Sequence, residues 1–133
     1  MITGLMLVML AAQAAPDPPR QARQALVQAD QEATRAADAC RAGEWEKCST
    51  LLEGTQKSVE QARETLDKSG INPQRNPRHH KDAEIRTRKI LKVLRALVSY
   101  IHPEDRKHYD AVVSRVSEIN DYLLNSILVR KKK

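Results

Sequence analysis

The fold of this chain is decided by the stretch Ala39-Cys40-Arg41-Ala42-Gly43-Glu44-Trp45-Glu46-Lys47-Cys48. An alanine-rich helical pattern precedes it, and a pattern of leucine and valine follows it. A single glycine between two helical patterns is typical of a tight turn, because glycine readily adopts conformations that end a helix. The stretch therefore predicts the tip of an antiparallel helical hairpin with one cysteine on each arm.

The two arms of this hairpin are predicted at about residues 19–42 and 44–69. Pro19 suits the first position of a helix, where its missing N–H costs nothing. Apolar and small residues then recur at spacings of three and four, as on one face of a helix. In the first arm this inward face is Ala22, Leu26, Ala29, Ala33, Ala36, Ala37 and Cys40, and in the second it is Trp45, Cys48, Leu52, Thr55, Val59, Ala62 and Leu66.

The second half of the chain predicts another hairpin. Residues 70–77 contain two Asn-Pro steps, which disfavour helix and mark a linker. Helices are predicted at about 77–101 and 103–130, with His102-Pro103 between them. Their buried residues are expected to be Ala83, Thr87, Ile90, Leu91, Leu94, Leu97, Val98 and Ile101 in the first, and Tyr109, Val112, Val113, Val116, Ile119, Leu123, Leu124, Ile127 and Leu128 in the second.

The predicted fold is all-α. Two hairpins with nearly equal arms favour a four-helix bundle whose helices run up, down, up and down. The alternative is a short solenoid of two stacked hairpins. A chain of 133 residues is long enough for one small domain, so residues 15–133 are predicted to form a single helical domain.

Residues 36–52 resemble the helix–turn–helix centre of a tetratricopeptide repeat. Gly43, Trp45 and Cys48 take the places of its glycine, aromatic and small residues. The resemblance implies hairpin geometry and a role in protein interaction. It covers about 17 residues, and no second copy with a period near ~34 is present. It therefore assigns no binding residue.

The N-terminus predicts export. Leu5–Leu10 is an apolar run too short to anchor a chain in a bilayer, and Ala12-Gln13-Ala14 has small residues where a signal peptidase requires them. Residues 1–14 are therefore interpreted as a signal peptide, although no Lys or Arg precedes the apolar run. The expected location is periplasmic or extracellular.

The two cysteines have two interpretations. Cys40 and Cys48 lie four residues on either side of Glu44, so an antiparallel hairpin places them opposite one another. In an oxidising compartment they are expected to form a disulfide. They are otherwise two small buried apolar residues.

The sequence has no pattern typical of an enzyme or a metalloprotein. No glycine-rich phosphate loop, nucleophile elbow or His-Glu-x-x-His is present. His79 and His80 are adjacent and cannot face one metal ion from a helix, and Asp105 with His108 supplies only two ligands. A non-enzymatic protein without a cofactor is therefore expected, and an enzyme or metalloprotein is disfavoured.

Positive charge is concentrated in the second half of the chain. Residues 15–69 carry 8 Lys or Arg and 10 Asp or Glu, a net charge of −2, whereas residues 70–133 carry 15 and 7, a net charge of +8. If the last two helices are antiparallel, two basic segments meet at one end of the bundle. This predicted basic pole is the candidate anion-binding site: Arg75, Arg78, His79, His80, Lys81, Arg130, Lys131, Lys132 and Lys133.

Two functions are consistent with these patterns. The first is an exported, non-enzymatic helical protein that acts as an interaction or envelope-associated module with an unknown protein partner. The second is a protein that binds anionic ligands, such as lipid headgroups or a polyanion, at the basic pole. Nucleic acid is disfavoured because no aromatic residues are interspersed among the basic ones, and self-association through the alanine faces stays open.

Overall fold

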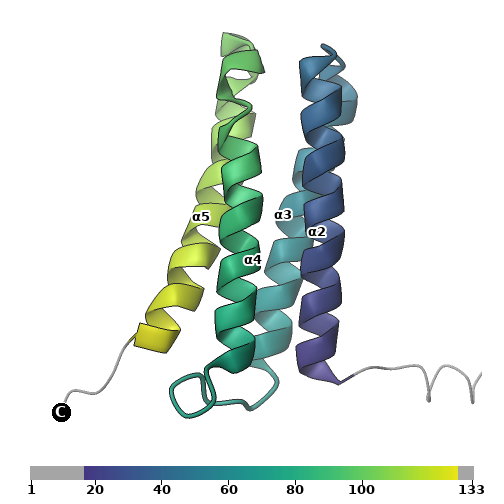
Figure 1. The fold of residues 1–133 in the computed structure, drawn as a ribbon. Helices are drawn as coiled ribbons and strands as arrows, with labels where there is room; N and C mark the ends of the chain where they lie inside the picture. The colour runs from purple at the N-terminus through teal and green to yellow at the C-terminus, as the bar shows by residue number, and fades with distance from the viewer. Residues whose placement is uncertain (1–16, 129–133) are drawn as a thin grey trace, which may run out of the picture.

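A computed structural model describes residues 17–128, which form an all-α bundle of four long helices (Figure 1). The helices are α2 (Pro18–Arg41), α3 (Trp45–Asp67), α4 (Arg78–Arg95) and α5 (Arg106–Leu128). Two short 3-10 turns, η1 (Val98–Tyr100) and η2 (Pro103–Asp105), lie between α4 and α5. The predicted fold class and the alternating direction of the helices are confirmed. The predicted signal peptide lies outside the described residues.

The first helix begins with a side-chain cap. The Asp17 carboxylate accepts a hydrogen bond from the backbone N–H of Arg20 at 3.1 Å, and Pro18 follows at the start of the helix. The cap satisfies one of the N–H groups that a helix start leaves without an intrahelical partner. The N-terminus of α2 is therefore well defined, and it places Arg20 and Arg23 at the end of the bundle where α4 also begins.

The tip of the first hairpin has the predicted geometry. Gly43 has a φ of 79°, in the left-handed region that glycine adopts at little cost. Cys40 and Cys48 form a disulfide, with their Cα atoms 5.2 Å apart. The pairing confirms the first of the two interpretations of these cysteines and indicates an oxidising environment.

The predicted end of the helix at 77–101 is wrong. This helix, α4, ends at Arg95, six residues before the expected Ile101. Residues 96–101 instead turn through tighter 3-10 hydrogen bonds, such as Tyr100 N–H to Leu97 O at 2.8 Å. Pro103 holds His102 extended, with a ψ of 150°, so an α-helix cannot continue through this segment. The same proline delays α5, whose first predicted residues form η2.

The order of helices around the bundle was not predictable from their order in the chain. The first helix of one hairpin packs against the first helix of the other, and the second against the second. Thus α2 lies beside α4 and α3 lies beside α5, whereas α3 and α4 lie on a diagonal and make little contact. Because direction alternates along the chain, α2 and α4 are parallel neighbours, and so are α3 and α5. The linker at residues 70–77 therefore crosses a diagonal of the bundle.

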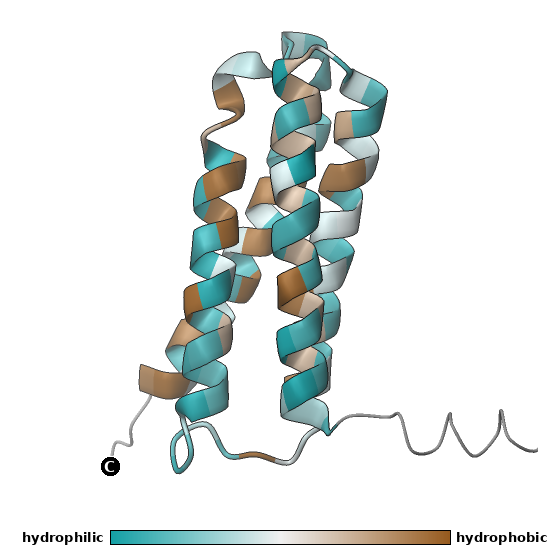
Figure 2. Ribbon diagram, turned by 45° about the vertical axis from the view of Figure 1, so that its right-hand side comes forward, coloured by the Kyte–Doolittle hydropathy of each residue, from teal (hydrophilic) through white to brown (hydrophobic). Residues whose placement is uncertain are grey.

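A continuous apolar core runs along the bundle axis, and most of the predicted inward residues line it. Figure 2 shows apolar positions facing the space between the helices and hydrophilic ones facing outward. Leu52, Leu94 and Ile119 are fully buried. Six predicted core positions are instead exposed or only partly buried, and they are Trp45, Val113, Val98, Leu124, Ile127 and Leu128. The last three lie where α5 diverges from α4 near the end of the described chain. Val98 lies in η1, beyond the end of α4.

Close contact between α2 and α3 depends on Gly54. A Cβ added there would lie 2.8 Å from a carboxylate oxygen of Glu32. The same carboxylate accepts a hydrogen bond of 3.0 Å from the Ser58 hydroxyl. A side chain at residue 54 would therefore displace the end of the Glu32 side chain from this position.

Candidate functional site

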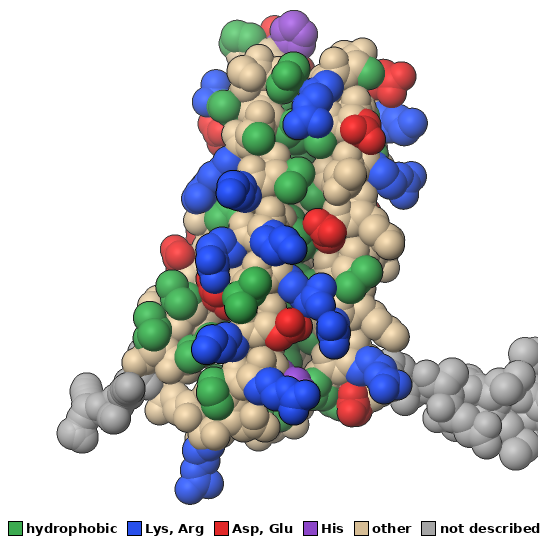
Figure 3. All heavy atoms as spheres, in the orientation of Figure 1, with side chains coloured by type: hydrophobic (Ala, Val, Ile, Leu, Met, Phe, Trp, Pro, Cys, Tyr) green, Lys and Arg blue, Asp and Glu red, His purple; other side chains and the backbone are tan. Residues whose placement is uncertain are grey.

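The strongest functional feature is a basic face made by α2 and α4. α4 carries seven Lys or Arg and two Asp or Glu, and α2 carries four and three, so the pair has a net charge of +6. α3 carries three and five, and α5 three and three, which gives −2 for the other pair. Figure 3 shows Lys and Arg side chains along the whole height of the face presented by α4 and α2. The charge thus divides between two long faces rather than between two ends.

Most cations of this basic face have no acidic partner. Arg86 and Arg88 pair with carboxylates one turn earlier on α4, at 3.1 and 2.9 Å. The other nine make no ion pair with any described residue, and they are Arg20, Arg23, Arg35, Arg41, Arg78, Lys81, Lys89, Lys92 and Arg95. All nine are exposed. The face therefore presents unneutralised positive charge to solvent.

A hollow lies between the first turns of α2 and α4. Its volume is about 340 Å³, and its floor is formed by buried Ala22, Leu26 and Ala83. The residues at its rim are Asp17, Pro19, Arg20, Arg23, Arg78, His79 and Asp82. Both rim carboxylates are already engaged, one as the helix cap and one with Arg86. The arginines are the groups left to bind an anion.

A second hollow lies further along the same pair of helices. Its volume is about 460 Å³, and it is lined by Asp30, Arg41, Lys89, Lys92, Val93 and Ala96. The Arg41 guanidinium also lies over the Tyr100 ring, 5.8 Å from its centroid. The two hollows share a chemical pattern, because each combines apolar side chains with Lys or Arg on both helices.

The structure brings part of the predicted basic pole together. Arg75, Arg78 and Lys81 are exposed near the start of α4, and His79 is partly buried beside them. α5 ends at this same end of the bundle. The predicted contribution of Arg130–Lys133 lies outside the described residues. The predicted basic pole did not include Lys89 and Lys92. Charge was counted separately for the two halves of the chain, and only the packing of α2 beside α4 shows that these lysines belong to one basic surface.

His80 was predicted to face anions, and this prediction is wrong. Its side chain is buried, 3% exposed, with Nδ1 lacking a hydrogen-bond partner. Burial lowers the pKa of His80, although the nearby Asp67 carboxylate acts in the opposite direction. The signal for burial was in the sequence: His80 precedes Thr87 and Leu94 by seven and fourteen residues, which places all three on one helix face.

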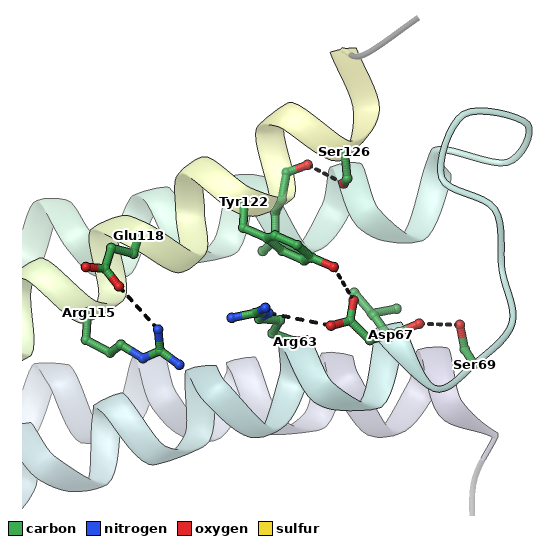
Figure 4. A network of polar contacts seen from close by, with 9 residues as sticks. Arg63, Asp67, Ser69, Arg115, Glu118, Tyr122 and Ser126 are labelled. Carbon is green, nitrogen blue, oxygen red and sulfur yellow. Dashed lines mark hydrogen bonds and ion pairs between the residues drawn. The ribbon is translucent and has the colours of Figure 1, made fainter. Parts of the chain in front are cut away.

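The opposite face, between α3 and α5, is held by paired charges. Figure 4 shows the Tyr122 hydroxyl donating to Asp67 at 2.8 Å, while Arg63 reaches the same carboxylate at 3.5 Å. The Arg63 guanidinium also lies 4.1 Å from the centroid of the Tyr122 ring. The hydrogen bond to Asp67 raises the pKa of Tyr122. These contacts fasten the diverging end of α5 to α3.

A second set of paired charges lies further along α3 and α5. Arg115 donates to Glu60 at 2.7 Å and to Glu118 at 3.2 Å. The hydrogen bond from Arg115 lowers the pKa of Glu60. Because these charges neutralise one another, they stabilise the packing of α3 against α5.

One constellation near the hairpin tip contains the residue types of a hydrolase triad. The Ser49 hydroxyl lies 3.0 Å from His108 Nε2, and Glu53 lies 3.5 Å from the same nitrogen. In a serine hydrolase the carboxylate contacts the other ring nitrogen, so that Nε2 is free to take the serine proton. The Trp45 ring packs edge-on against the imidazole, with centroids 6.0 Å apart. The arrangement fits a contact between α3 and α5 better than a proton relay.

The described residues lack two further kinds of feature. No group of three or more His, Cys, Asp or Glu side chains is placed to hold a metal ion within residues 17–128. In the same range, no helix combines the length and the apolar character that crossing a membrane requires.

Comparison with known protein families, curated proteins and solved structures found no match to this chain. The class defined by the fold is a disulfide-linked, all-α helical bundle.

Proposed function

We propose that this protein is an exported, non-enzymatic helical interaction module that binds an anionic partner through the basic face of α2 and α4. The observation that carries the proposal is the contrast between the two faces: +6 with nine unpaired cations on one, and −2 with more than half of its charges paired on the other. Charge left unpaired along one face of a small bundle supports attraction of a partner of opposite charge.

The disulfide supports the compartment assigned in this proposal. Disulfides persist in secreted and periplasmic proteins and are rare where thiols are kept reduced. Together with the apolar run Leu5–Leu10 before Ala12-Gln13-Ala14, the disulfide supports export to the periplasm or the extracellular space.

The test is a charge reversal on the basic face with a matched control on the other face. Lys89→Glu with Lys92→Glu should weaken binding to immobilised heparin strongly, so that the variant elutes at much lower salt than the wild type. Lys57→Glu with Lys107→Glu changes the net charge equally on α3 and α5, at exposed positions, and should have a clearly smaller effect. Equal loss in the two variants would mean that only net charge matters and would refute a binding face.

A second candidate function is binding to anionic lipid headgroups at the basic end. It is favoured by exposed Leu124 and Leu128, 38% and 60% exposed, on the last turns of α5, just before the basic tail Arg130–Lys133. A basic cluster gains about 1 kcal/mol per Lys or Arg near an anionic membrane. Truncation after Val129 should then abolish co-sedimentation with anionic vesicles and leave heparin binding by the basic face in place.

A further inference from the structure

The groove between α2 and α4 is apolar as well as basic. The first hollow has a floor of Ala22, Leu26 and Ala83, and the second includes Val93 and Ala96. Both hollows lie along the same pair of parallel helices. Apolar side chains with Lys or Arg beside them therefore occur in both hollows where α2 meets α4.

Two exposed branched residues lie, along their helices, between the residues that line the two hollows. Val27 on α2 is 41% exposed, and Ile85 on α4 is 42% exposed. Val27 follows Arg23 by one helical turn, and Ile85 precedes Lys89 by one turn, so each shares its helix face with a cation. A polymer that offers only negative charge would leave these side chains in water.

We propose that this groove binds an acidic amphipathic helix of a protein partner. The inference rests on the proposed function, since it names the partner that the basic face binds. A helix supplies both required chemistries, because its apolar residues recur at i, i+3, i+4 and i+7 and its carboxylates flank that stripe. Charge complementarity sets the sign of the partner's charge. The unpaired cations that line the two hollows match Asp or Glu on both flanks of the partner's apolar stripe, and they are Arg20, Arg23, Arg41, Arg78, Lys89 and Lys92.

The length of the groove sets the length of the partner helix. Ala83 in the first hollow and Val93 in the second are ten residues apart on α4, which corresponds to about 15 Å of helix. A segment of about 18 residues, roughly 27 Å long, covers both hollows and the cations beyond them. Its apolar side chains would contact the two hollows together with Val27 and Ile85.

The probe is a pair of synthetic 18-residue peptides of identical composition, rich in Leu and Glu. In one peptide the leucines line a single helix face, and in the other they are dispersed around the helix. Fluorescence anisotropy with the full disulfide-bonded chain should give an affinity about tenfold or more higher for the amphipathic peptide, because only it buries Val27 and Ile85.

Variants of the protein separate the apolar contribution from charge and from peptide helicity. Val27→Ser with Ile85→Ser leaves the net charge unchanged and should remove the preference between the two peptides while heparin binding stays at the wild-type level. Leu124→Ser, at a similarly exposed position on α5, should preserve the preference. Thermal melting of each variant checks that the bundle is intact.

The outcomes distinguish this inference from the proposed function. Equal affinity for both peptides, with heparin binding retained, overturns the amphipathic partner and leaves an anion-binding face. Binding of anionic vesicles by the chain truncated after Val129, without any preference between the peptides, assigns the groove to a lipid surface and also overturns the inference. Failure to bind peptides, heparin and vesicles alike refutes the proposed function itself.

Discussion

His80 shows how one buried side chain links stability to pH. Burial lowers the pKa of its imidazole in the folded protein, while in the unfolded chain the pKa returns to about 6.5. Between these two values the unfolded chain binds a proton that the folded chain does not. The free energy of unfolding therefore falls as pH decreases from about 7, with a slope of at most about 1.4 kcal/mol per pH unit for one such group.

Replacement of His80 should flatten this pH dependence. We expect His80→Gln to show a smaller loss of stability between pH 7 and pH 5 than the wild type, as measured by urea denaturation at several pH values. His79→Gln is the matched control, because His79 is adjacent and less buried. The account would be contradicted by an identical slope in His80→Gln and the wild type. Glu60 and Glu84 add a separate loss only at lower pH, since their pKa values are lowered and their stabilisation disappears as they protonate.

At the scale of the helix pair, α4 and α5 are joined by both apolar and polar contacts. Asn120 Nδ2 donates to the backbone carbonyl of Glu84 at 3.1 Å and to its carboxylate at 3.2 Å. The Tyr109 hydroxyl donates to the carbonyl of Leu94 at 2.6 Å. These buried hydrogen bonds fix the register of the two helices, and the apolar residues between them supply most of the stabilisation.

Truncation of Leu94 should test this pairing. Leu94 is fully buried, so Leu94→Ala should lower the free energy of unfolding by about 2–5 kcal/mol through lost burial and a residual cavity. Leu124→Ala removes the same atoms from a side chain that is 38% exposed, and should cost less than about 1 kcal/mol. Urea denaturation of both variants gives the comparison, and equal costs would show that the apolar contact is elsewhere.

Loss of the disulfide should destabilise the first hairpin without unfolding it. The Cys40–Cys48 bridge closes a loop with a sequence separation of eight, for which chain entropy predicts about 2 kcal/mol. Replacing both cysteines by serine should lower stability by about that amount. The wild type in reducing agent should match the double variant, whereas a wild type indifferent to reductant would contradict a formed bridge.

The elements could be predicted from sequence to different degrees. The turn at Gly43 and the buried faces of α2 and α3 followed from local patterns, because a glycine and a three-four periodicity act over a few residues. The end of α4 could not be predicted from local patterns. Leu97 and Ile101 keep helical spacing in the sequence, although the backbone changes to tighter turns before Pro103. The divergence of α5 is set by tertiary packing, so the exposure of Leu124 carried no local signal.

At the scale of the molecule, function depends on which helices become neighbours. A bundle with α2 beside α5 would bury much the same apolar stripes and use linkers of the same length. It would also separate the unpaired cations of α2 from those of α4. Sequence periodicity does not distinguish these arrangements, so the sequence predicted only the basic end, and the basic face along α2 and α4 became apparent in the structure.

The most direct measurement is a titration of the isotopically labelled, disulfide-bonded protein with a sulfated heparin oligosaccharide, followed by two-dimensional NMR of the backbone amides. The predicted result is a set of salt-sensitive shift changes along α2 and α4, including Arg23, Lys89 and Lys92, with α3 and α5 nearly unaffected. Changes spread equally over all four helices, or confined to the linker around Arg75, would contradict a basic face made by the parallel pairing of α2 and α4.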